Sequence, residues 1–252
     1  PFKTTQIVLI RIPAGAFTMG LTRWPNWAVN DWKPVTLTRS FWMGVYTITQ
    51  RQYELVMGDS AQASVPCKGN TRPAIVSWSA LRGASDKYDW PAVTAVDSQS
   101  FIGKLRAKTG LELDLPTMAQ WQYACCAGTS SYYNNGGSNE VDLKLVGRAW
   151  TENTLPVGSY IANCLGLYDM HGNVGQWCLE HAEPQNSDPE VDPVGSSDGG
   201  NRMFCGLSPR DGYWHPCSSA FYTMSASNPD ANSYRYTSSI YLGFRLSGFV
   251  NE

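Results

Sequence analysis

The chain has 252 residues, of which 42% are hydrophobic, 12% are aromatic and only 16% are charged. Disordered chains have few aromatic residues and a high net charge, so this composition predicts a folded protein with one large domain or two small ones. The formal net charge is -2, which lacks the basic excess of proteins that bind nucleic acids. No apolar run approaches the roughly 20 residues of a membrane-spanning helix. We therefore expect a folded domain without a nucleic-acid partner.

The cysteines indicate how much of the stability depends on disulfides. They are Cys67, Cys125, Cys126, Cys164, Cys178, Cys205 and Cys217. An odd number leaves at least one thiol unpaired within the chain, and no two cysteines have the CxxC spacing. We expect most of them to be small buried apolar residues, although one or two disulfides stay open as an alternative. The chain begins with Pro1 rather than Met, from which we expect a preceding segment that has been cleaved or left out.

Strands are predicted first in chain order. Apolar runs predict strands over Gln6–Ile12, Val35–Thr38 and Trp42–Tyr46, with a turn at Pro13 and Gly15 after the first.

Three helices follow in the first half of the chain. Thr49 and Gln52 have the spacing of a capping box, which predicts a helix that ends at Gly58. A second helix is predicted from near Asp97 to Gly110. Thr117 and Gln120 repeat the capping-box spacing, which predicts a third helix that ends near Gly128.

Beyond Gly128 the helical periodicity is lost. Gly, Asn, Ser, Asp and Pro clusters predict loops over Ser130–Glu140 and Glu183–Asn201. Short strands are predicted at Leu165–Met170, Val174–Leu179, Met203–Ser208, Ser219–Thr223 and Gly243–Val250. The expected fold class is therefore α+β, with two to three helices, short twisted antiparallel sheets and long ordered loops.

Few residues in the chain indicate catalysis. The three histidines are His171, His181 and His215, and the Cys178–His181 spacing has no second half of a zinc site. Nucleophile elbows, phosphate-binding glycine loops and zinc-protease motifs are absent from the sequence. The acidic residues near Asp188 lack the register of an EF-hand. We predict no catalytic residues, no metal and no cofactor.

Four motifs carry a family resemblance. They are Ile12–Gly20 (IPAGAFTMG), Asp114–Ala124 (DLPTMAQWQYA), Gly166–Trp177 (GLYDMHGNVGQW) and Leu242–Leu246 (LGFRL). Together they resemble the formylglycine-generating-enzyme, or sulfatase-modifying-factor, family from about Ile7 to Leu246. The resemblance implies a single domain over 1–252 with an elaborated C-type lectin-like fold in which the terminal strands pair.

Two departures from the family affect the expected function. Enzymatic members carry a reactive cysteine pair just before the segment that matches Cys217–Ala220, whereas Gly206–Pro216 contains no cysteine. Gln176 stands where the family uses a carboxylate for calcium, which argues against that structural metal. We therefore expect the chain not to be an enzyme, and we interpret His171–Asn173 as a turn-building core motif.

The last fifth of the chain suggests a binding surface. Residues 202–247 contain no Lys, Glu or Gln, and their aromatic residues stand among Ser, Asn and Gly, as in surfaces that bind varied ligands. This pattern resembles the variable proteins of diversity-generating retroelements, most closely those of the Treponema type, which carry a hypervariable C-terminal segment on a lectin fold. We predict that 202–247 is such a segment, with Met203, Trp214, Met224 and Leu242–Leu246 as fixed scaffold. The predicted ligand contacts are Arg210, Asp211, Tyr213, Trp214, His215, Phe221, Tyr222, Tyr234, Tyr236 and Tyr241.

The resemblance also implies where the protein acts. We expect an extracellular or cell-surface lipoprotein of the outer membrane, held by an N-terminal lipid anchor outside this chain and binding a protein or another macromolecule. Two alternatives stay open: a carbohydrate-binding lectin, although the calcium-dependent sugar site of ordinary C-type lectins is absent, and a formylglycine-generating-type modifying enzyme.

Overall fold

The computed structural model describes most of the chain. The described residues are 1–20, 22–23, 32–59, 61–62, 65, 67–84, 88, 90–148, 153–181, 187–196, 201–206, 220–225 and 241–250, with the backbone alone at 22–23, 148 and 220–225. The helices are α1 (Gln50–Met57), α2 (Trp78–Arg82), α3 (Phe101–Thr109), α4 (Met118–Cys126) and α5 (Glu140–Val146). The strands are β1 (Leu9–Ile12), β2 (Gly15–Gly20), β3 (Thr22–Arg23), β4 (Trp32–Leu37), β5 (Phe41–Gly44), β6 (Gly147–Arg148), β7 (His171–Gly172), β8 (Gly175–His181), β9 (Glu190–Val191), β10 (Asn201–Cys205), β11 (Ala220–Ser225), β12 (Leu242–Gly243) and β13 (Ser247–Phe249).

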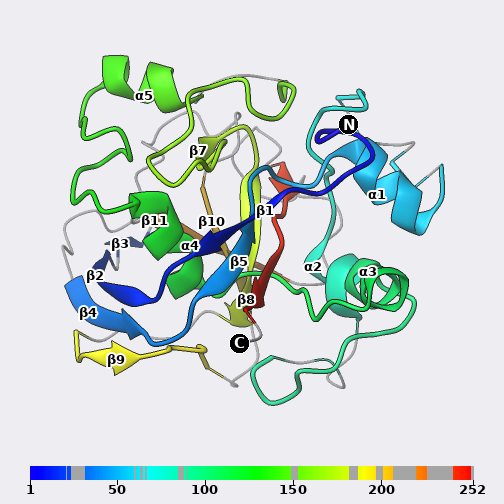
Figure 1. The fold of residues 1–252 in the computed structure, drawn as a ribbon, viewed down its shortest axis with the longest axis horizontal. Helices are drawn as coiled ribbons and strands as arrows, with labels where there is room; N and C mark the ends of the chain where they lie inside the picture. The colour runs from blue at the N-terminus through cyan, green and yellow to red at the C-terminus, as the bar shows by residue number, and fades with distance from the viewer. Residues whose placement is uncertain are drawn as a thin grey trace.

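The strands form several small sheets. The largest has the order β12-β8-β10-β11-β3, and two three-stranded sheets have the orders β1-β5-β13 and β2-β4-β9. Figure 1 shows α1, α2 and α3 grouped on one side of these sheets and β2, β4 and β9 toward the other. The predicted α+β class with few helices and small sheets is confirmed.

The two ends of the chain meet in one sheet, but not as expected. β1 pairs with β5 through Leu9 and Gly44, and β13 pairs with the other edge of β5 through Ser247 and Met43. β5 therefore lies between the terminal strands, and the expected direct pairing of those strands is wrong. Each terminal strand instead forms hydrogen bonds with β5, so the backbone N–H and C=O groups on both edges of β5 have partners.

The helix starts follow from side-chain capping. Both predicted capping boxes are present, at Thr49 with Gln52 and at Thr117 with Gln120. Two short helices were not predicted: α2 begins at the N-cap Ser77, and α5 begins at Asn139, which forms a capping box with Asp142. The described chain thus has more than the expected two to three helices, because single caps can start helices too short to show a periodic apolar pattern.

Several predicted strands are wrong or misplaced. Leu165–Met170 is not a strand, because the Asn163 side-chain oxygen accepts the backbone N–H groups of Leu165 and Leu167 and so turns the chain. The predicted turn at Gly15 is the start of β2. The predicted strand Gly243–Val250 is divided into β12 and β13, since Phe244–Leu246 lie between two different sheets.

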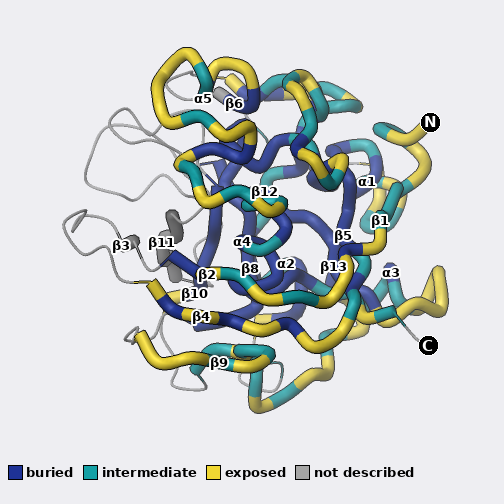
Figure 2. The backbone as a smooth tube through the Cα atoms, turned by 60° about the vertical axis from the view of Figure 1, so that its left-hand side comes forward, coloured by how far each residue is buried: buried dark blue, intermediate teal, exposed yellow. Residues whose placement is uncertain are grey.

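Two apolar clusters form most of the core. The first surrounds α4, where Trp121 and Cys125 pack among residues of β1, β2, β5, β8 and β10. The second joins α1, α2 and α3 to Trp177 and Phe244. Figure 2 shows the central strands and α4 as a continuous buried interior. In the described part of the chain, no helix has the length and apolarity needed to cross a membrane.

Candidate ligand-binding site

Most of the predicted contact residues lie outside the described residues. These are Arg210, Asp211, Tyr213, Trp214, His215, Tyr234 and Tyr236. Phe221 and Tyr222 belong to β11, whose backbone pairs with β10 so that Tyr222 stands opposite Phe204. The position of the 202–247 segment therefore follows from the described residues at its two ends.

Tyr241 is corrected from a predicted ligand contact to a core residue. Its side chain is 2% exposed and packs with Cys67 and Val174. The Cys67 thiol lies 3.9 Å from the Tyr241 hydroxyl. A ring that is enclosed in this way contributes to folding and has no face left for a ligand.

The segment begins on a buried strand. Met203, Phe204 and Cys205 of β10 are at most 1% exposed, and the Phe204 ring packs edge-on against Trp177. The Arg202 guanidinium lies 3.7 Å from the centre of the Trp78 ring and donates to the Leu179 carbonyl at 2.9 Å. The first residues of 202–247 are thus part of the scaffold, as predicted for Met203.

The segment also ends in the core. Leu242 of β12 pairs in parallel with Gly175 of β8, and the Phe244 ring packs edge-on against Phe101 at 5.0 Å. Because the sheet order is β12-β8-β10, the strand before the segment and the strand after it flank the same central strand, β8. The predicted scaffold role of Leu242–Leu246 agrees with this burial.

Gln176 joins the family motifs at the centre of the fold. Its side-chain oxygen accepts from the Trp121 indole at 2.9 Å and from the Arg245 guanidinium at 2.8 Å. Its amide nitrogen donates to the Asp169 carbonyl at 2.7 Å. Burial lowers the pKa of Arg245 to about 10, so this residue remains a cation at neutral pH.

These contacts do not fit the calcium that the family resemblance implies. The Gln176 oxygen already faces a buried guanidinium, which would repel a second cation there. The Asn173 side-chain oxygen accepts the Leu155 N–H at 2.8 Å, and its nitrogen donates to the Leu155 carbonyl. Among the described residues, no group of three or more His, Cys, Asp and Glu side chains is placed to hold a metal.

The neighbouring His171 likewise has a structural position. Its ring is fully buried, and Nε2 accepts the Asn134 backbone N–H at 3.0 Å. The Tyr133 ring packs edge-on against it. These contacts agree with our interpretation of His171–Asn173 as a turn-building core motif.

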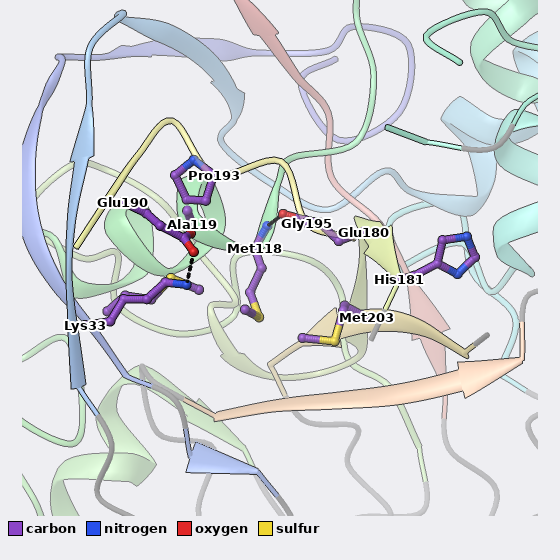
Figure 3. A pocket seen from close by; sticks show the side chains of 10 residues that line it. Lys33, Met118, Ala119, Glu180, His181, Glu190, Pro193, Gly195 and Met203 are labelled. Atoms are coloured by element: carbon purple, nitrogen blue, oxygen red, sulfur yellow. Dashed lines mark hydrogen bonds and ion pairs between the residues drawn. The ribbon is translucent and has the colours of Figure 1, made fainter. Parts of the chain in front are cut away.

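A small pocket beside β10 gathers several ionisable side chains (Figure 3). Lys33 is 3% exposed and forms an ion pair with Glu190 at 2.8 Å. Glu180 accepts the Met118 backbone N–H at 2.7 Å, and in Figure 3 His181 points away from this pair. The cavity among them is about 10 Å³, which is about the space of one water molecule. This cluster therefore holds the loop after β9 against the core rather than binding an organic ligand.

The thiols of β8 and β10 were the remaining candidates for chemistry. The sulfur atoms of Cys178 and Cys205 lie 3.8 Å apart, and both side chains are fully buried. Burial raises the pKa of the Cys178 thiol well above its ordinary value. A reactive cysteine needs its thiolate, so Cys178 is poorly suited to act as a nucleophile.

Sequence reasoning identified the motifs but missed how they contact one another. It did not predict the ion-pair network in which Asp114 accepts from Arg82 and Arg106, each at 3.0 Å. Asp114 opens one of the quoted motifs, and Arg245 lies in another. The motifs therefore gave a signal for these buried polar residues, but not for their partners.

The fold and these buried motifs define an α+β protein of the C-type lectin-like class. A family model described as a sulfatase-modifying factor enzyme 1-like domain matches residues 2–247, and the chain belongs to this family.

Two relatives show the range of names in the family. The chain is 30% identical over 214 residues to a protein named chaperone protein LppX from Paenibacillus barcinonensis, covering 70% of this chain and 73% of that one. It is 23% identical over 239 residues to the formylglycine-generating enzyme of Bos taurus, covering 77% and 64%.

Two solved structures have a similar fold. Treponema denticola variable protein 1 has a TM-score of 0.70 and 21% identity, covering 96% of this chain and 95% of that one. PvdO from Pseudomonas aeruginosa has the same TM-score at 18% identity, covering 98% and 99%. Because the two scores are equal, the likeness establishes the fold and leaves the activity open.

Proposed function

We propose that this protein binds ligands without catalysis, through a diversifiable segment between Gly206 and Tyr241 on a fixed scaffold. The observation that carries the proposal is that buried strands hold both ends of the segment, β10 before it and β12 after it; we call these two strands its anchors. The segment leaves β10 and returns at β12, the two strands that flank β8, and the residues on both sides are buried. Within the segment the backbone is also held at β11, which pairs with β10, so we infer that its side chains can change while the anchors keep the core in place.

The composition of the segment supports the same proposal. Tyr213, Trp214, Tyr222, Tyr234 and Tyr236 stand among Ser, Asn and Gly. Tyrosine and tryptophan provide a large contact area at little cost in side-chain entropy, and the small polar residues provide adaptable hydrogen bonds. We expect the aromatic residues and Arg210 to contribute most of the binding energy.

The proposed class predicts a genetic signature. A reverse-transcriptase gene and an adenine-rich near-copy of the 3′ end of the coding sequence should lie close to this gene. Sequencing the surrounding genome tests this, and a neighbourhood without both features would argue against a retroelement. Membership of this class further implies a cell-surface lipoprotein that binds a protein or another macromolecule, which surface labelling of intact cells would test.

Replacing Tyr213, Tyr222 and Tyr236 together with Ser tests the role of the aromatic residues. We expect the melting temperature to change by only a few degrees, because these rings are proposed to face a ligand. Thermal unfolding measured by circular dichroism gives the result, and a collapse of the fold would instead assign the rings to the core.

A displayed library tests diversification directly. Varying Tyr213, Tyr222 and Tyr236 on the yeast surface and selecting against lysozyme should give folded, specific binders. The matched control varies Trp121, Trp177 and Phe244, which are fully buried, and should lose surface display. Equal loss of display from both libraries would contradict the proposal.

A modifying enzyme is the second candidate, because relatives in the family are named formylglycine-generating enzymes. Incubation with copper, oxygen and a cysteine-containing peptide, followed by mass spectrometry, distinguishes the two. Formylglycine in the peptide would overturn the non-enzymatic proposal. A sugar array probed with and without chelator tests the lectin alternative, which predicts calcium-dependent binding.

A further inference from the structure

A separate cleft of about 280 Å³ has no residue of β10 or β11 among its described lining residues. It is bounded by the end of β13, the segment between α3 and α4, the turn before β5 and the loop after β9. Its volume approaches the several hundred Å³ of small-molecule sites. Nothing in the proposed function uses this cleft.

The floor and walls of the cleft are apolar. Phe41, Leu115 and Leu179 line it and are at most 4% exposed. Phe249 and Val194 also line it, yet they are 47% and 45% exposed. The cleft therefore offers an enclosed apolar surface that opens to solvent between partly exposed hydrophobic side chains.

Most charged side chains around the cleft are already paired. Arg106 binds Glu112 at 3.2 Å and Asp114 at 3.0 Å, and Asp114 also binds Arg82. The Asp192 carboxylate accepts from the backbone and the hydroxyl of Thr38. These groups are therefore committed to holding the walls together.

Arg39 is the exception among the charged groups that line the cleft. Its guanidinium carbon lies 4.1 Å from the centre of the Phe249 ring, which holds the cation in place by a cation–π contact. No carboxylate within the described ranges lies within ion-pair distance of it. A cation that is positioned but not neutralised is suited to bind an anionic group.

A second unused donor lies deeper in the cleft. Gln120 is 6% exposed, and its side-chain oxygen accepts from the Thr117 backbone at 3.0 Å and from the Ser247 hydroxyl at 3.3 Å. Its amide nitrogen has no hydrogen-bond partner in the described part of the protein. The nitrogen is not among the enclosed polar atoms that lack a partner in the described chain, so it is open to the cleft and is suited to donate to a ligand oxygen.

We propose that this cleft binds a small organic acid with an apolar body and a second oxygen acceptor. The carboxylate pairs with Arg39 at the mouth, the apolar body lies against Leu115 and Phe249, and the second oxygen accepts from the Gln120 amide. The anion supplies the counter-charge that Arg39 lacks, and the acceptor pairs with the open Gln120 donor.

N-acetyl-L-phenylalanine has all three features and serves as the probe in isothermal titration calorimetry. We expect saturable binding, at least about tenfold weaker for Arg39→Gln, because a hydrogen bond to a charged group contributes about 1.5 kcal/mol or more. The neutral N-acetyl-L-phenylalaninamide should bind the unmodified protein about tenfold more weakly than the acid, and Arg39→Gln should leave its affinity unchanged.

One further variant tests the Gln120 donor, and a second one is a matched control. Gln120→Glu keeps the oxygen that accepts from Thr117 and removes the amide donor, so it should also weaken binding of the acid. Arg51→Gln removes a guanidinium on α1, outside the cleft, and should bind as the unmodified protein does. Thermal unfolding confirms that each variant is folded.

Three results would overturn the proposal. The first is equal affinity for the acid and its amide, and the second is an equal loss of affinity in Arg39→Gln and Arg51→Gln. The third is no saturable binding up to about 10 mM, because a weaker Kd would not indicate a specific site. The result does not depend on the C-terminal segment, because the triple Ser variant should bind the probe normally.

Discussion

Asp169 illustrates how a single buried carboxyl group makes the stability of this protein depend on pH. It lies in the left-handed region at φ 56°, and one of its oxygens accepts the Gly158 N–H at 2.7 Å. Burial raises its pKa to about 6, although Gly158, Arg245 and Lys3 favour the charged form. The folded protein therefore binds a proton there that the unfolded chain releases at lower pH.

This raised pKa predicts a loss of stability as the pH increases. The contribution of Asp169 is greatest below the pKa of the unfolded chain, about 3.9, and is lost as the pH rises through about 6. Relative to Asp169→Asn, the unmodified protein should lose about 2 kcal/mol of unfolding free energy between about pH 4 and pH 7. Urea denaturation at several pH values measures this.

A substitution that changes no titratable group provides the control for this measurement. Gln99 is exposed, so the pH profile of Gln99→Ala should run parallel to that of the unmodified protein. A constant difference between Asp169→Asn and the unmodified protein across this range would contradict the assigned role.

The Gln176 side chain connects the central motifs by hydrogen bonds. In Gln176→Ala, the buried Trp121 indole and the Arg245 guanidinium each lose an acceptor. The indole then has no acceptor, and Arg245 loses the bond from Nε. Arg245 keeps its bonds to the carbonyls of Gly44, Val45 and Tyr168. Two buried donors without an acceptor should lower the free energy of unfolding by about 3 kcal/mol. Denaturant unfolding measures the loss, and Gln99→Ala on the surface should change stability little.

At the level of elements, β8 and β10 form the rigid centre of the largest sheet. They carry Cys178 and Cys205, whose thiols are enclosed between the strands and α4. Because both side chains are buried, an alkylating reagent reaches them only when the sheet opens.

Alkylation with iodoacetamide should therefore separate the cysteines by element. Under native conditions Cys164, which is exposed, should react first, and Cys178 and Cys205 should react only after unfolding. Mass spectrometry of peptides from timed samples measures the order. Rapid native labelling of Cys178 would show that the sheet opens readily and would weaken the case for a fixed scaffold.

For the whole molecule, the fold separates the buried family motifs from the two surfaces that we propose bind ligands. The interior joins α4, β8 and the terminal residues of the chain through Trp121, Gln176 and Arg245. The proposed C-terminal segment begins and ends on this interior, and the cleft at Arg39 lies on another part of it. This arrangement explains why changes in the segment should leave both the melting temperature and the cleft unaffected.

The class of fold, the capping boxes at Thr49 and Thr117, and the family motifs could be predicted from the sequence alone, because these depend on local patterns of neighbouring residues. Prediction failed where long-range contacts compete with local preference. The Asn163 side chain turns a predicted strand into a loop, β5 separates the terminal strands, and Tyr241 is buried although its neighbours suggest a binding surface. Only the folded structure shows the partners of Gln176 and Asp114 and the cleft at Arg39. Each of these sites brings together residues that are far apart in the chain, and no local sequence pattern specifies which distant residues come into contact.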